Sequence, residues 1–403
     1  MKRRLQFIIF FFLIFECIFL GLAYKVFKIN KIALVAIIAL SICSYGYFFY
    51  EVFNYNRSSG PTHSFYWAFG LMVLHIIPKI ITVFFWFISL FLVLLPTTFL
   101  QPAELTGRKS FIGKMGLIIA TIPFSSILYG LWKGKYNFKV LKKSLAFEDL
   151  PKSFDGLKVL QISDLHSGSF DSKEKIEYAI DLINQQEFDL LLFTGDIVNV
   201  EATEFEPWIK TFNKLKTPEF GKFSVLGNHD YGAYKEWNSE EEKQNNFEAI
   251  KNLHGKIDFK LLCNEHVLIE KDDQKIAVVG VENWGEKFMK AGDLSKASEG
   301  LVKEDFKILM SHDPSHWEYE VKNHPNHYHL TLSGHTHGFQ FGIEIPGFFK
   351  WSPVQYVYKQ WAGLYEHANK FVYVNRGFGF HAFPGRVGIW PEITVLELTS
   401  KKA

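Results

Sequence analysis

The sequence predicts an α/β soluble domain preceded by an N-terminal, multi-span α-helical membrane domain. Apolar stretches long enough to cross a bilayer fall within residues 1–135, and short β-rich segments alternate with helical patterns after about residue 155. The two parts also carry net charges of opposite sign. We therefore expect a transmembrane domain at 1–135, a linker at 136–154 and a soluble domain at 155–400.

The charge distribution supports this division. Residues 1–135 contain thirteen Lys and Arg against three Asp and Glu, a net charge of +10, whereas the remainder carries −8. The basic residues flank apolar runs instead of forming a patch, so we expect the lipid bilayer as a partner and no nucleic-acid binding. The three cysteines include no CxxC pair, which excludes a cysteine-ligated zinc site.

About four membrane spans are predicted. The runs 5–23, 32–50 and 115–132 are each near the roughly 20 residues that cross a bilayer. The run 64–100 would make a helix about 55 Å long, with Pro78 near its middle, and we expect one long or kinked span. A cleaved signal peptide is the rival interpretation for the first run. Its length and the spans that follow disfavour that reading.

The positive-inside rule predicts the side of the soluble domain. With four spans its side carries nine Lys and Arg against six on the other side, and with five spans nine against seven. Both arrangements predict a multi-pass protein of the bacterial inner membrane with its soluble domain in the cytoplasm. The sequence does not define the oligomeric state.

Three ionisable residues, Glu16, His75 and Lys79, lie within or between the predicted spans. Such groups are candidates for function because charge is costly in hydrocarbon. The interpretation we favour is structural: snorkelling toward the interface or a contact between helices.

Short β-rich runs and helical patterns make up the soluble part. The pattern Ile176, Ala179, Ile180 and Ile183 has helical spacing and lies between the first two runs, so a strand-helix-strand unit is expected there. The predicted strands are 157–162, 190–193, 223–226, 276–281, 308–310, 330–332, 371–374 and 393–398, and the predicted helices are 172–186 and 245–254.

Polar motifs follow five of these strands directly. The carboxyl ends of neighbouring strands meet at one edge of a sheet, so we expect these side chains to converge. The motifs are Asp164-Leu165-His166, Gly195-Asp196, Gly227-Asn228-His229-Asp230, Ser311-His312-Asp313 and Gly334-His335-Thr336-His337.

The motifs supply two Asp, one Asn and four His as candidate metal ligands. Such O and N donors suit Mn, Fe, Zn, Co or Ni and do not select one of them. The set is too large for one tetrahedral ion and sufficient for two divalent ions that share a bridging carboxylate. Each motif alone is more often a core histidine or a turn, but five in order after β-like runs favour the metal site. By contrast, His324, His327 and His329 are predicted to be loop residues, and His254 and His266 carry no motif.

The order of these motifs resembles that of the calcineurin-like metallophosphoesterase superfamily, over about residues 155–398. The segment 373–379 with Arg386 and Pro391-Glu392 is similar to the C-terminal region of its bacterial membrane-anchored members. The resemblance implies a two-sheet β-sandwich flanked by helices and two divalent ions (Mn, Fe or Zn). It implies these roles: Asp164, His166 and His337 on one ion, Asn228, His312 and His335 on the other, Asp196 bridging them, and His229 as a non-ligand general acid.

The sequence departs from that pattern at two positions. Many relatives have Asp three residues after the bridging Asp, where it orients the catalytic His, and here Asn199 stands there. The GHTH motif is often followed by two glycines, and here Gly338 is followed by Phe339. Arg376 and Arg386 are candidates to contact a substrate phosphate, with a structural or surface role as the alternative.

The function predicted is a membrane-anchored, metal-dependent hydrolase of phosphate esters, with a lipid or lipid-linked phosphate as substrate. A nucleotide-sugar-lipid pyrophosphatase is the second prediction. A membrane scaffold or sensor that retains the fold is a third, which the intact ligand set disfavours. Aromatic residues between Phe339 and Trp361 form an apolar wall or dip toward the bilayer in this prediction, and ordinary packing is the alternative. They are Phe339, Phe341, Phe348, Phe349, Trp351, Tyr356, Tyr358 and Trp361.

Overall fold

The computed structural model describes residues 2–94 and 102–401. The chain divides into two compact units. The first comprises residues 1–55 and 62–131, and the second comprises 56–61 and 132–403.

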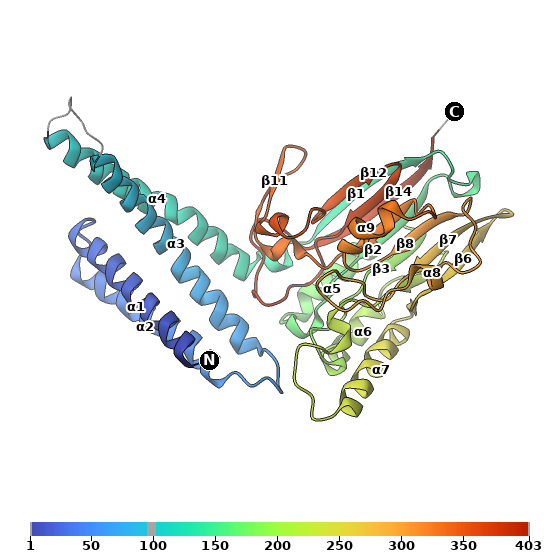
Figure 1. Cartoon of the computed structure of the whole chain (residues 1–403), viewed down its shortest axis with the longest axis horizontal. Helices are drawn as coiled ribbons and strands as arrows, with labels where there is room; N and C mark the ends of the chain where they lie inside the picture. The colour runs from blue at the N-terminus through green and yellow to red at the C-terminus, as the bar shows by residue number, and fades with distance from the viewer. Residues whose placement is uncertain (1, 95–101, 402–403) are drawn as a thin grey trace. The chain divides into compact units, whose positions relative to one another are not determined.

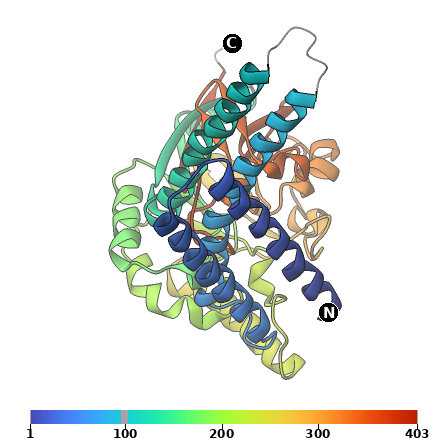
Figure 2. The ribbon, with the colours of Figure 1, turned by 90° about the vertical axis from the view of Figure 1, so that its left-hand side faces the viewer.

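Four long helices form the first unit (Figure 1, Figure 2). They are α1 (Lys2–Lys25), α2 (Lys31–Asn54), α3 (His63–Leu94) and α4 (Pro102–Trp132). Each contains a stretch long and apolar enough to cross a membrane: Phe7–Lys25, Lys31–Asn54, His63–Phe91 and Phe111–Trp132. The helix α3 continues through Pro78, so the long span expected at 64–100 is a single helix as far as Leu94. Residues 95–100 of that expectation lie outside the described residues.

The three ionisable residues predicted within or between the spans meet inside this unit. The amine of Lys79 donates to both carboxylate oxygens of Glu16, at 2.7 and 2.8 Å, and to Ser41 Oγ at 2.8 Å. His75 Nε2 lies 2.7 Å from the same amine. These residues come from α1, α2 and α3, so the contact between helices that we expected is confirmed. Pairing offsets part of the cost of removing both charges from water.

Two six-stranded sheets form the second unit (Figure 1). The first has the order β1 (Lys139–Phe147), β14 (Glu392–Ser400), β2 (Leu157–Ile162), β3 (Leu190–Phe193), β4 (Lys222–Ser224), β5 (Lys260–Leu261). The second has the order β12 (Gly363–His367), β13 (Lys370–Val374), β9 (Leu330–Ser333), β8 (Phe306–Met310), β7 (Gln274–Gly280), β6 (Glu265–Lys271). A separate hairpin consists of β10 (Ile343–Ile345) and β11 (Phe349–Trp351).

The sheets pack face to face over a shared apolar core, which joins residues such as Val159 and Leu192 of the first sheet to Val278 and Leu332 of the second. The outer face of the first sheet packs against α5 (Lys173–Asn184), α6 (Ile209–Phe212) and α7 (Glu240–Lys256). The outer face of the second packs against α8 (Leu294–Ala297) and α9 (Ser315–Tyr319). The expected two-sheet sandwich flanked by helices is confirmed.

The segment predicted as a linker, 136–154, contains the edge strand β1. It pairs in parallel with β14, from Lys139 opposite Glu392 to Phe147 opposite Ser400. Only Leu145 and Phe147 of this strand are buried, and its first half is lysine-rich. Edge strands commonly carry charges that discourage pairing with other chains, which made this strand resemble a linker.

Candidate metal centre

Loops at the carboxyl ends of β2, β3, β4, β8 and β9 carry the seven predicted ligands, and several sit on strained backbone. Five of them have positive φ in the left-handed region: Asp164 at 54°, His166 at 46°, Asp196 at 60°, His335 at 70° and His337 at 49°. This conformation costs roughly 1–2 kcal/mol for a residue with a Cβ atom. Such strain gathers at functional sites, where the surrounding structure holds it.

Gly334 allows the loop after β9 to approach the loop after β2. A Cβ atom at this position would lie 1.9 Å from Ser163 Oγ and 2.2 Å from Asp164 Oδ2. The close approach lets the backbone N–H of His335 donate to both carboxylate oxygens of Asp164, at 2.9 and 3.0 Å. His335 of the Gly334-His335-Thr336-His337 motif therefore orients Asp164 of the Asp164-Leu165-His166 motif.

One group of predicted ligands comprises Asp164, His166 and His337. One ligand atom of each lies within 4.8 Å of the others, and all three side chains are buried. His337 Nε2 is 3.2 Å from Asp164 Oδ1 but makes no hydrogen bond. A buried polar atom without a partner is uncommon, and a metal ion would satisfy this one.

The second group comprises Asn228, His312 and His335. His335 Nδ1 lies 2.7 Å from Asn228 Oδ1 and 3.3 Å from His312 Nε2. His312 Nδ1 contacts the backbone carbonyl oxygen of Thr194 at 2.7 Å, which fixes the ring and turns Nε2 toward the centre. Second contacts of this kind orient metal-binding histidines.

Asp196 lies between the two groups. Its Oδ2 atom is 3.1 Å from His312 Nε2 and 3.5 Å from His166 Nε2, one nitrogen from each group. Two ligands bound to one ion at 2.0–2.2 Å are about 3–3.5 Å apart. The spacing and the donor types therefore fit two divalent ions with Asp196 between them.

The electrostatics of the centre suit cations. Burial is the main cause that lowers the pKa of His166, His335 and His337, which favours the neutral imidazole that a metal requires. Burial alone would raise the pKa of Asp196, but the nearby His312 and other imidazoles hold it well below the usual range.

His229 is placed beside the centre and is not among the two ligand groups. Its Nδ1 lies 2.7 Å from the backbone carbonyl oxygen of Asn199, and its ring stacks on Tyr234 with centroids 4.1 Å apart. Its backbone N–H donates to Asp196 Oδ1 at 2.8 Å. Tyr234 in turn accepts a hydrogen bond from Asn228 Nδ2 at 2.5 Å. The imidazole is thus fixed on both sides.

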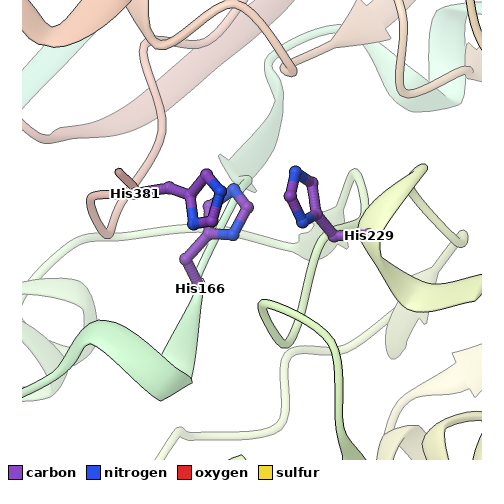
Figure 3. A group of neighbouring side chains, drawn as sticks. All are labelled: His166, His229 and His381. Atoms are coloured by element: carbon purple, nitrogen blue, oxygen red, sulfur yellow. The ribbon is translucent and has the colours of Figure 1, made fainter. Parts of the chain in front are cut away.

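The structure adds His381, which the sequence interpretation missed (Figure 3). Its ring stacks on His166, with centroids 4.8 Å apart and an interplanar angle of 18°, and meets His229 at 4.5 Å. His381 lies between β13 and β14 and is part of none of the five sequence motifs. Its position two residues after the recognised segment 373–379 was the available signal.

The side chain of Asn199 does not contact His229. Its Oδ1 atom lies 3.1 Å from His166 Nδ1 and 3.3 Å from His381 Nδ1.

Phe339, the other departure from the family pattern, has φ of 50° directly after Gly338 at 56°. This is the left-handed region, which glycine enters without strain, and the side chain of Phe339 is half exposed.

The two arginines offered as substrate contacts, Arg376 and Arg386, have partners within the protein, which agrees with the structural role given as their alternative. Arg376 pairs with Glu392 and with Glu344 Oε1, the latter at 2.5 Å. Arg386 is fully buried and donates to the backbone carbonyls of Gly377 and Gly379. Its Nη2 also lies 3.1 Å from His337 Nδ1. Arg376 thus joins the β10–β11 hairpin to β14, and Arg386 holds the loop between β13 and β14.

The histidines predicted to lie in a loop do so. His324, His327 and His329 fall between Asn323, the end of a short helix, and Leu330, the start of β9. His329 Nε2 contacts Asp149 Oδ2 at 2.7 Å.

Comparison with known proteins identifies the family of both parts of the chain. Residues 157–339 match the calcineurin-like phosphoesterase family, and residues 2–135 match the family described as probable calcineurin-like phosphoesterase, transmembrane domain. The uncharacterized metallophosphoesterase YkuE of Bacillus subtilis is 32% identical over 62% of this chain and 82% of its own length. A transmembrane protein with metallophosphoesterase domain from Danio rerio is 28% identical over 67% of this chain and 60% of its own length. Among solved structures, the Haemophilus influenzae NAD nucleotidase matches 56% of this chain and 46% of its own, with 15% identity and a TM-score of 0.36.

A cradle of candidate metal ligands at the strand ends of a two-sheet sandwich, preceded by four apolar helices, fits a membrane-bound phosphoester hydrolase. The chain belongs to the calcineurin-like metallophosphoesterase family, in the form that carries an N-terminal transmembrane domain.

Proposed function

We propose that this protein hydrolyses a phosphate ester of a lipid or lipid-linked substrate, at a centre of two divalent ions on the cytoplasmic side of a bacterial inner membrane. The observation that carries the two-ion centre is the position of Asp196 Oδ2 within 3.5 Å of a histidine nitrogen from each group. The membrane domain favours a substrate that resides in the bilayer.

The contacts of the residues support the roles that the family resemblance implies. Asp164, His166 and His337 would hold one ion, Asn228, His312 and His335 the other, and Asp196 both. Two ions in such a site activate water and neutralise charge on a phosphoryl group. We assign no choice among Mn, Fe and Zn.

His229 is the proposed general acid. Its Nδ1 is engaged by the carbonyl of Asn199, so Nε2 remains to face the leaving oxygen. Proton transfer of this kind contributes about 10²–10⁴-fold to the rate. His381 lies against His229 and His166 and lines the same side of the site.

The test is a hydrolysis screen with the detergent-solubilised full chain, after metal removal and reloading with Mn, Fe or Zn. The substrates are p-nitrophenyl phosphate, bis-p-nitrophenyl phosphate, a panel of lipid phosphates and a nucleotide-sugar lipid diphosphate. We expect metal-dependent turnover that Asp196→Asn abolishes, with lipid phosphates preferred. Preference for the diphosphate would instead establish the pyrophosphatase. Absence of metal-dependent turnover on every substrate would establish the scaffold.

Sidedness has its own test. A phosphatase reporter fused at the C-terminus is active only when exported, so the cytoplasmic assignment predicts an inactive fusion. An active fusion would place the domain on the opposite side.

A further inference from the structure

The exposed apolar side chains of the second unit are concentrated in one short segment. Among the described residues after Trp132, seven of the thirteen large apolar side chains that are exposed lie between Phe339 and Val357. They are Phe339, Ile343, Ile345, Phe348, Phe349, Tyr356 and Val357. Figure 1 shows the hairpin of β10 and β11 in this segment standing away from the two sheets. An exposed apolar patch of this kind commonly marks an interaction site.

The hairpin has the reverse polarity of a water-exposed one. Ile345 pairs with Phe349 and both are exposed, whereas Glu344 pairs with Lys350 and both are partly buried. Glu344 accepts from Arg376 at 2.5 Å, and Lys350 donates to Tyr365 Oη at 3.0 Å. Phe348 at the turn has 86% of its surface exposed. Charges turned inward and apolar groups turned outward suit an apolar surrounding.

The hairpin lies beside the residues that follow the last span. A groove of the second unit is lined by Lys139, Lys142 and Lys143 of β1 and by Pro346 and Gly347 of the hairpin turn. Lys139 is only seven residues after Trp132, the end of α4, so the chain between them spans at most about 25 Å. The three lysines are exposed. Cationic side chains next to an apolar tip match the anionic headgroups and acyl boundary of a bilayer.

Both ends of the apolar segment adjoin the metal centre. His337 precedes Phe339 by two residues, and Tyr358, whose hydroxyl is 2.8 Å from His335 Nε2, directly follows Val357. The segment thus begins next to one candidate ligand, His337, and ends next to a contact with a second, His335. Its backbone therefore links the tip of the hairpin to the metal centre at both ends.

We propose that the tip of the β10–β11 hairpin docks into the interfacial layer of an anionic bilayer, with Lys139, Lys142 and Lys143 on the headgroups, and that it presents lipid phosphates to the metal centre. The docking is inferred only from the exposed apolar hairpin and the lysines beside it. The presentation of substrate rests on the proposed function.

Docking is tested with the full chain reconstituted into vesicles that contain phosphatidylglycerol. Cys17, Cys43 and Cys263 are replaced by Ser, and an environment-sensitive fluorophore is attached through Phe348→Cys or, as a control, through Tyr178→Cys on α5. We expect nitroxide-labelled acyl chains to quench the probe at 348, and iodide to quench the exposed probe at 178. Replacing phosphatidylglycerol by phosphatidylcholine should reduce the lipid quenching at 348.

Equal iodide quenching at both positions would overturn the docking. A second result would also overturn the docking: a probe at 348 that neither iodide nor the lipid quencher reaches. A protein surface, such as a second copy of the chain, would then cover the tip.

Presentation is tested with the double variant Phe348→Glu, Phe349→Glu. We expect turnover of a lipid phosphate in vesicles to fall about tenfold or more, while turnover of p-nitrophenyl phosphate stays unchanged, and Tyr178→Glu is the matched control. Unchanged turnover of both substrates would contradict the presentation. If the wild-type chain hydrolyses no phosphoester with any metal, the proposed function fails, and the probe at 348 still decides the docking separately.

Discussion

His229 is oriented by the backbone of Asn199, with its Nδ1 atom 2.7 Å from the carbonyl oxygen of that residue. The Asn199 side chain is thereby free to contact His166 instead. Asn199 occupies the position where many relatives have an aspartate, and it contacts two histidines. Its backbone carbonyl contacts His229, and its side-chain amide contacts His166. A carboxylate is not needed to fix the candidate general acid.

Replacing Asn199 by Ala is expected to weaken metal binding more than catalysis. The variant loses the contact to His166 Nδ1 and keeps the carbonyl that holds His229. Loss of such an outer contact costs about 10–100-fold in metal affinity. Activity measured against metal concentration should shift by that factor and approach the wild-type kcat at saturation. Asn213→Ala, at the exposed C-cap of α6, is the control; a fall in kcat at saturating metal would refute the division of roles.

His229→Ala is expected to lower kcat by about 10²–10⁴-fold on alkyl phosphates, whose leaving group needs a proton. The loss should be smaller on p-nitrophenyl phosphate, because p-nitrophenolate leaves without protonation. Metal content should stay at the wild-type value, since His229 is none of the seven proposed ligands; a loss of metal would instead indicate that the neighbouring group of His166, His229 and His381 binds an ion. Equal losses on the two substrates would show that His229 stabilises charge on the phosphoryl group and does not act as an acid.

Gly334→Ala is expected to abolish metal binding while the sheets remain folded. Its methyl group would fall 1.9 Å from Ser163 Oγ and 2.2 Å from Asp164 Oδ2, forcing the two ligand loops apart. Elemental analysis of purified protein measures the metal, and circular dichroism measures the fold. Gly255→Ala in α7 is the matched control, because a Cβ atom there meets nothing within 4 Å. Wild-type metal content in the Gly334 variant would contradict the predicted site.

In the membrane unit, Lys79→Met is expected to destabilise the helices by about 3–5 kcal/mol, because Glu16 would keep an unpaired buried charge. The double variant Glu16→Leu, Lys79→Met should recover most of that loss, since neither charge remains. Thermal unfolding of the detergent-solubilised protein, followed by helical circular dichroism, measures both. Lys25→Met at the exposed end of α1 is the control. A double variant no more stable than the single one would mean that the pair contributes net stability.

Glu204 is expected to make stability depend on pH. Burial raises the pKa of this carboxyl to about 7, against 4.5 for an exposed one, although three backbone N–H groups oppose the shift. The folded chain therefore holds a proton that the unfolded chain has lost, so its contribution to stability is full below about pH 4.5 and is lost as pH rises to about 7. Glu204→Gln should flatten the decline of the unfolding midpoint between pH 5 and 7.5. Exposed Glu206→Gln should leave it unchanged.

The sequence predicts the inner strands and the ligand loops well because both are local. The strand β3 is a continuous apolar run that ends shortly before Gly195 and Asp196, and β2 is a mostly apolar run that ends shortly before Asp164, so period and turn chemistry agree. The strand β1 escaped prediction because its outer half faces solvent and its partner β14 lies some 250 residues away in sequence.

His381 and the two arginines show where local pattern fails. His381 reaches the centre because its loop is drawn in by tertiary hydrogen bonds, including one from its backbone N–H to Gln340 Oε1 at 2.6 Å. Arg386 is buried because carbonyls of the same loop surround its guanidinium. The position of His381 and the burial of Arg386 cannot be predicted from the spacing of residues in the sequence. Both depend on the conformation of the loop between β13 and β14 in the folded domain.

The left-handed backbone at five of the seven candidate ligands has a consequence for how the protein matures. Hydrogen bonds within the protein already hold these turns, as His335 to Asp164 and His166 to the carbonyl of Asp196 show. The cradle is therefore complete when the domain has folded. We therefore expect that metal can be removed and replaced without unfolding the domain. The supply of divalent ions, and not the folding pathway, would then set which metal the candidate centre takes.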